Sequence, residues 1–171
     1  PADLVETAVA WKNAVCSKIT PTCLIFSRQG TTAIGRTPEQ ISAIEMGGYL
    51  LKEKKDNDIT IVASGSEVQL ALDAAKELEN KSINANVVSM PSLDIFLQQS
   101  SEYQKMVIDT HKPVLVVECA HPNSWYKILN RSDKVLGIET FGESAPGGEL
   151  LEHFGFNKEK VIQAAKSLID D

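Results

Sequence analysis

The chain has 171 residues, of which 43% are hydrophobic, and it carries a formal net charge of −6 with a pI of about 5.1. This length suits one ordinary domain and part of a second, and no apolar run approaches the roughly 20 residues that span a bilayer. Because the acidic balance disfavours nucleic acid phosphates and anionic membrane surfaces, we expect no nucleic acid and no membrane among the partners.

The first helix is predicted to start after Asp3, a typical N-cap, and to run toward Pro21. Residues 22–27 are mostly apolar and predict a strand covered on both faces, with Arg28 at its C-terminal end. A threonine- and glycine-containing stretch follows and predicts a linker. Because the sequence begins at Pro1 without an initiator methionine, we expect it to be part of a longer protein.

From residue 37 onward, short helices and strands alternate. Strands are predicted at 49–52, 59–64, 85–90, 114–118 and 135–138. Helices are predicted from residue 37, at 66–80, 93–97, 103–108, 125–129 and 149–153, and from Asn157 onward. This alternation predicts an α/β fold with three αβα layers and a mostly parallel five-stranded sheet. The charged turn at 53–57 suggests that the 49–52 strand lies antiparallel at an edge.

The turn Ser64-Gly65-Ser66 lies between a strand and the start of a helix, where backbone amides and the helix dipole suit an anion. Gly65 and Ser66 are therefore a possible anion site. One glycine does not make a phosphate loop, however, and the neighbouring Glu67 would repel an anion. A tight turn with a helix cap remains the plainer interpretation.

Arg28 suits phosphate binding through its planar guanidinium, although its position alone favours an exposed salt bridge as the more ordinary role. The histidines are widely separated and form no metal-binding spacing, and Cys119 with His121 lacks a third group to orient a dyad. The odd number of cysteines, without a Cys-x-x-Cys pair, favours a reducing, cytoplasmic location over a disulfide framework. We therefore predict no catalytic residue and no metal site in this chain.

Several short segments, in order along nearly the whole chain, together resemble the C-terminal end of transketolase. They are residues 6–12, 24–29, 47–52, 63–68, 87–92, 141–146 and 154–156. Ser27-Arg28-Gln29 and the Phe-Gly-Glu-Ser-Ala-Pro sequence at 141–146 are the most specific of these. Gly147 and Gly148 differ from many relatives, which have better helix formers there, and this makes the start of the next helix uncertain.

The resemblance implies a division of the chain into three parts. Residues 1–29 would be the terminal helix and strand of the middle, pyrimidine-binding domain, 30–44 a linker, and 45–171 the C-terminal domain. Within this division, Arg28 corresponds to the family's arginine that binds the substrate phosphate.

The resemblance also implies the activity of a full-length enzyme. Transketolases are homodimers that transfer a two-carbon ketol unit between sugar phosphates in the pentose phosphate pathway, using thiamine diphosphate with Mg²⁺ (or Ca²⁺). The catalytic and cofactor-binding residues would lie in upstream domains, so this chain alone would bind no cofactor and be inactive. Two alternatives remain: a regulatory module that binds a small molecule or anion near Gly65 and Ser66, and a structural dimerisation domain.

Overall fold

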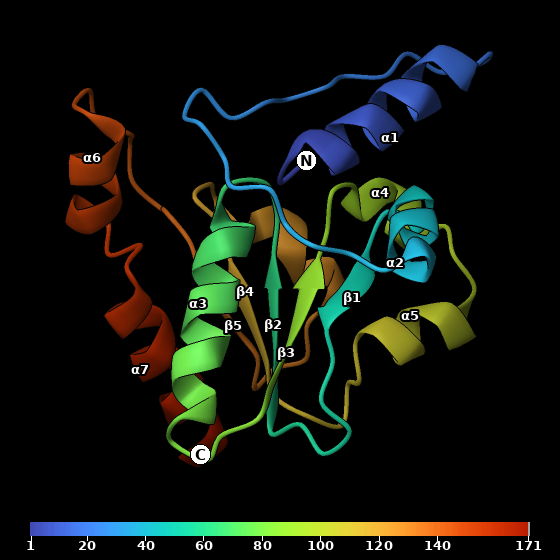
Figure 1. The fold of residues 1–171 in the computed structure, drawn as a ribbon. Helices are drawn as coiled ribbons and strands as arrows, with labels where there is room; N and C mark the ends of the chain where they lie inside the picture. The colour runs from blue at the N-terminus through green and yellow to red at the C-terminus, as the bar shows by residue number, and fades with distance from the viewer. Residues whose placement is uncertain (171) are drawn as a thin grey trace.

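The computed structural model describes residues 1–170, which build a five-stranded sheet between two layers of helices (Figure 1). The strands are β1 (Tyr49–Lys52), β2 (Ile59–Ala63), β3 (Ala85–Ser89), β4 (Val114–Val117) and β5 (Lys134–Leu136). Their order is β1-β3-β2-β4-β5, and all pairs are parallel except β1 with β3. The predicted fold class, including the antiparallel edge strand, is confirmed. The charged turn does not make a hairpin, however, because β3 lies between β1 and β2.

Apolar residues on both faces of the central strands explain the three layers. Ile61, Leu115 and their neighbours pack under α3 (Glu67–Glu79) and α7 (Lys158–Asp170). Val62, Val116 and their neighbours pack under α4 (Leu93–Leu97), α5 (Ser101–Val107) and the 3-10 helix η2 (Pro122–Ile128). Since β2 and β4 are buried along their whole lengths, they form the centre of the core, as near-continuous apolar strands do in parallel sheets.

Two glycines allow β1 to enter the sheet close to α4. They follow α2 (Pro38–Ala43) and η1 (Ile44–Met46). Gly47 has φ +86, and a Cβ there would lie 2.5 Å from the carbonyl oxygen of Ser92. At Gly48 a Cβ would lie 2.4 Å from the sulfur of Met90. The pair therefore ends the helix, as predicted, and also permits a close approach that no larger residue could make.

The N-terminal part of the chain lies above the carboxyl ends of the strands (Figure 1). Helix α1 (Leu4–Cys16) begins as predicted, with the Asp3 carboxylate accepting from the backbone N–H of Glu6 at 3.1 Å. The predicted strand at 22–27 is wrong, because these residues form no strand in this structure. A strand requires a hydrogen-bonded neighbour, and none of the five strands in the described part of the chain pairs with this segment.

At the other end, α6 (Gly147–His153) begins at the glycine pair, two residues earlier than predicted. Helix α7 is capped as predicted, with Asn157 Oδ1 accepting from the backbone N–H of Lys160 at 3.0 Å. Among residues 1–170, no helix is both long and apolar enough to cross a membrane.

Candidate functional site

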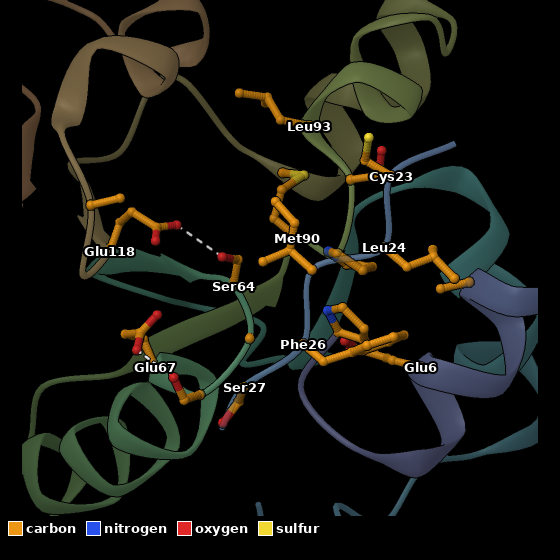
Figure 2. A pocket seen from close by; sticks show the side chains of 18 of the residues that line it. Glu6, Cys23, Leu24, Phe26, Ser27, Ser64, Glu67, Met90, Leu93 and Glu118 are labelled. Atoms are coloured by element: carbon orange, nitrogen blue, oxygen red, sulfur yellow. Dashed lines mark hydrogen bonds between the residues drawn. The ribbon is translucent and has the colours of Figure 1, made fainter. Parts of the chain in front are cut away.

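A hollow of about 650 Å³ opens at the carboxyl ends of β2, β3 and β4. The residues that follow these strands make its floor. Helix α1 and residues 22–27 make a wall that faces this floor (Figure 2). Because β3 and β4 flank β2 on opposite sides, the hollow lies where the strand order reverses. Open α/β sheets characteristically bind ligands at this position.

Two acidic side chains, Glu67 and Glu118, lie beside several serines in the floor. Ser64, just after β2, donates a hydrogen bond of 2.8 Å to Glu118, just after β4. Ser66 donates one of 2.7 Å to Glu67, whose side chain is buried. Figure 2 shows Glu67 and Glu118 on the same side of the hollow, across from Phe26 and Leu24. The floor therefore carries negative charge.

The two acids affect the ionisation of their neighbours. Burial raises the pKa of Glu118, and the nearby Glu67 raises it further, while hydrogen bonds from Ser64 and Trp125 oppose the increase. Burial likewise raises the pKa of the Cys119 thiol, and Glu67 and Glu118 add to the effect. A thiol held in its protonated form is a poor nucleophile, so Cys119 with His121 makes no reactive dyad.

The predicted anion site at Gly65 and Ser66 lies at the edge of this hollow. Gly65 has φ +52, as a tight turn requires, but the Ser66 side chain does not cap α3, contrary to expectation. It donates to the Glu67 carboxylate instead. The acids beside the turn would repel a phosphate, so the local charge does not favour an anion here.

Arg28 is exposed and does not line the hollow. It stands in a bend, where Ser27 Oγ donates to the carbonyl oxygen of Gln29 at 2.8 Å. Within residues 1–170, Arg28 forms no salt bridge, so its guanidinium is available for an external partner. The next residue, Gln29, reaches α6, where a Cβ on Gly147 would lie 2.4 Å from Gln29 Nε2.

A buried polar cluster beside the hollow could not be predicted from local sequence. Arg36 donates to Asp3 at 2.6 Å, to Glu6 at 3.1 Å and to the Tyr49 hydroxyl at 2.6 Å. Tyr49 and Ser89 in turn donate to Glu6 at 2.7 and 2.6 Å. We call these five residues the Arg36 cluster. Hydrogen-bonded members lie up to 83 positions apart, and no sequence motif connects them.

The charges of the Arg36 cluster stabilise one another. Burial alone would raise the pKa of Asp3, but hydrogen bonds from Arg36 and from the amides of Ile34 and Glu6 bring that pKa below its usual value. Burial alone would lower the pKa of Arg36, but Asp3, Tyr49 and Glu6 raise it. Burial and the Glu6 carboxylate raise the pKa of Tyr49. The cluster therefore favours the charged forms of Asp3 and Arg36, and keeps Tyr49 as a protonated donor.

No group of three or more His, Cys, Asp or Glu side chains in the described part of the chain could hold a metal ion. The three cysteines are free thiols. The described residues therefore offer an exposed guanidinium without a salt bridge, that of Arg28, and an acidic hollow.

Comparisons with known proteins show which family the chain resembles. A family model described as "Transketolase-like TK C-terminal domain" matches residues 47–157. Transketolase 2 of Vibrio parahaemolyticus is 42% identical over 171 residues, which cover 99% of this chain and 26% of that protein.

Solved structures give the same result. A Pichia stipitis transketolase in complex with sedoheptulose-7-phosphate matches with a TM-score of 0.91 and 37% identity, over 99% of this chain and 24% of that one. The Campylobacter jejuni transketolase matches with a TM-score of 0.87 and 39% identity, over 98% and 25%. The chain thus spans about a quarter of the length of these relatives. It belongs to the transketolase family of transferases, in which it matches the C-terminal domain.

Proposed function

We propose that this chain is the C-terminal portion of a transketolase that transfers a two-carbon ketol unit between ketose and aldose phosphates in the pentose phosphate pathway. One observation carries the proposal: the likeness to transketolases extends over 99% of this chain and includes residues outside the C-terminal domain model. Continuity through α1 and residues 22–29 supports a shared role for the whole stretch.

In this proposal the chain contributes one substrate ligand and a supporting domain. Residues 1–29 belong to the middle domain, 30–44 are the linker, and 45–171 form the C-terminal domain. The exposed guanidinium of Arg28 binds the substrate phosphate, for which a planar, permanently charged fork is well suited. We assign no proton-transferring role to residues 1–170.

The upstream domains of the full enzyme bind the cofactor, thiamine diphosphate with Mg²⁺ or Ca²⁺, which supplies the carbanion chemistry. The residues described here offer no fitting diphosphate and metal site, because their acids face the hollow without a metal-binding arrangement. We therefore assign the cofactor no contact with this chain.

Exposed apolar side chains support the presence of further domains. Leu4, Val15, Ile19 and Ile25 are 77–94% exposed, on or beside α1. Monomeric soluble proteins rarely leave so many large apolar side chains uncovered in one region. We propose that the rest of the middle domain covers this surface, within a cytoplasmic homodimer.

The first experiment uses the chain by itself. With xylulose 5-phosphate and ribose 5-phosphate, the chain should show no ketol transfer, and calorimetry should show no binding of thiamine diphosphate with Mg²⁺. Turnover, or specific cofactor binding, would contradict the proposed division of roles.

The second experiment uses a chimera, in which this chain replaces the matching C-terminal quarter of Vibrio parahaemolyticus transketolase 2. We expect ketol transfer, and we expect Arg28→Ala to raise KM for ribose 5-phosphate at least about tenfold, the cost of losing a charged hydrogen-bonding partner. Arg131→Ala is the control. Arg131 is also exposed, but it precedes β5, at the end of the sheet away from the hollow. Equal KM values for the two variants would remove Arg28 from the phosphate site.

A regulatory anion site at Gly65 and Ser66 is the competing function, and the hollow beside them is large enough for a small metabolite. Glu67 and Glu118 make its charge unsuitable for a phosphate. Titration with inorganic phosphate should therefore leave the amide resonances of Gly65 and Ser66 unchanged. A saturable shift at these two amides would restore the regulatory alternative.

A further inference from the structure

The Arg36 cluster joins three parts of the chain that are separate in sequence. Asp3 and Glu6 belong to the start of α1, Arg36 to the segment before α2, and Tyr49 and Ser89 to the paired strands β1 and β3. Arg36 donates to Asp3 and Glu6 at the start of α1 and to Tyr49 on β1. Ser89 connects β3 to the cluster by donating to Glu6. The cluster is therefore a junction between α1 and the sheet.

Burial of this junction indicates that it defines geometry. The side chains of Arg36, Asp3 and Glu6 are only 0–2% exposed. Buried ion pairs are costly to desolvate, and apolar residues of similar volume are often equally stabilising. What apolar packing cannot supply is direction, whereas the planar guanidinium of Arg36 has its donors aimed at three fixed acceptors.

The junction closes the base of a long excursion of the chain. Asp3 accepts from the backbone N–H of Ile34 at 3.0 Å, so residues 4–33 leave the Arg36 cluster and return to it at almost the same point. Figure 1 shows this excursion as α1 and the extended blue segment above the sheet. Arg28 lies on it, and so does the wall of the hollow formed by residues 22–27.

Beyond its base, the excursion is weakly attached. No hydrogen bond joins residues 18–33 to residues 37–170 in this structure, and the hollow separates residues 22–27 from the ends of the strands. Its other contacts include the packing of α1 against η1, the apolar contacts of Val5 and Val9 with the core, an exposed ion pair between Lys12 and Glu45, and the approach of Gln29 to Gly147. The base is thus the place where the direction of the excursion is set.

We propose that the Arg36 cluster is an interdomain clamp, whose members are positioning residues that fix where Arg28 stands relative to the C-terminal domain. The clamp itself follows from the contacts of this chain. Its effect on catalysis rests on the proposed function, because it acts through Arg28 as the phosphate ligand. Opening the clamp should therefore weaken the binding of phosphorylated substrates more than it slows the chemical step.

The clamp is tested on this chain by hydrogen exchange of individual amides. Arg36→Met removes the charged fork, and Tyr49→Phe removes only the hydroxyl that joins Arg36 to Glu6. Both variants should speed exchange in α1 and at Ile34 by at least about tenfold while the amides of β2 and β4 keep their protection. Arg131→Met, at an exposed arginine outside the cluster, is the matched control and should change neither region.

Two results would overturn the clamp. The first is that the amides of α1 exchange as slowly in both variants as in the unmodified chain. The other is loss of protection in α1 and in the sheet together, which would make the cluster an ordinary part of one cooperative core. If Arg36→Met fails to fold, Tyr49→Phe decides between these results by itself, because its aromatic ring still fills the same space.

The catalytic consequence is tested in the chimera described above. Arg36→Met and Tyr49→Phe should raise KM for ribose 5-phosphate by about tenfold, the scale expected from a small misplacement of a ligand, with kcat changed far less. A purely structural role would lower kcat through loss of active enzyme and leave KM unchanged. An unmodified chimera without activity would count against the proposed function, whereas the exchange experiment would still decide the clamp.

Discussion

At the scale of single residues, Glu118 shows how the fold changes the chemistry of an ordinary side chain. Ser64 directly follows β2, and Glu67 begins α3. Both lie near Glu118, which follows the neighbouring strand β4. Burial and the second carboxylate together raise the pKa of Glu118 above the usual 4.5. The charged form is therefore less favourable in the folded protein than in the unfolded chain.

This shift predicts a pH-dependent effect of Glu118→Gln. Because the folded pKa is raised, the contribution of Glu118 to stability is fully present below pH 4.5 and is lost as the pH rises through the folded pKa. The glutamine cannot ionise, yet its amide oxygen can still accept from Ser64. The variant should match the unmodified chain near pH 4 and exceed it in unfolding free energy by about 0.5–1 kcal/mol at pH 8.

Urea denaturation at both pH values measures this difference. Glu53→Gln is the control, because Glu53 is exposed in the turn before β2 and should shift stability by less than about 0.5 kcal/mol at either pH. A Glu118→Gln variant that is less stable at pH 8 would show that the carboxylate is favourably paired and that the hollow is not acidic in the way described.

At the scale of elements, α6 illustrates a conflict between helix propensity and packing. Gly147 and Gly148 begin this helix, although glycine is among the weakest helix formers. Only Gly147 has a structural reason, because a Cβ there would meet the side chain of Gln29, whereas a Cβ on Gly148 would meet nothing within 4 Å. The first glycine thus permits contact with the Ser-Arg-Gln segment, and nothing in the structure explains the second.

Alanine should stabilise α6 more at position 148 than at position 147. Gly148→Ala should strengthen α6 by about 0.5–1 kcal/mol, seen as slower amide exchange at residues 150–155. Gly147→Ala should gain less or nothing in α6, because the methyl group displaces Gln29, and the resonances of Gln29 should shift. Equal gains without any change at Gln29 would show that the two segments do not meet in solution.

The elements also show what could be predicted from sequence. Local signals predict several elements correctly. The apolar runs of β2 to β4 indicate the sheet, while the cap at Asp3 and the glycines after η1 mark helix ends. The strand at 22–27 was predicted wrongly because strand formation depends on a neighbour that residues 1–170 do not supply. The charge of the hollow depends on Glu118, which is 54 residues from its partner Ser64. The role of Arg36 could not be predicted either, because all of its partners outside its own segment are distant in sequence.

At the scale of the whole molecule, apolar exposure is uneven. Trp11, Val15 and Ile19 are 53–94% exposed, in or just after α1, while the sheet is covered on both faces. A net charge of −6 favours solubility but does not cover this surface. By itself, the chain should bury these side chains against a second copy.

Sedimentation velocity over a range of concentrations tests this expectation. The unmodified chain should associate reversibly, and the double variant Val15→Lys with Ile19→Lys should stay monomeric. Met106→Lys is the control, because Met106 is 62% exposed on α5, away from α1, and should leave association unchanged. Association that is unaffected by the double variant would place the contact elsewhere.

We propose that this chain works as the C-terminal part of a transketolase, supplying Arg28 on an excursion that the Arg36 cluster holds in place. The most direct measurement is the rate of ketol transfer from xylulose 5-phosphate to ribose 5-phosphate by the chimera that carries this chain. We predict activity within about tenfold of the parent enzyme, with Arg28→Ala raising KM for ribose 5-phosphate. A folded, dimeric chimera that binds thiamine diphosphate but transfers no ketol unit would contradict the claim.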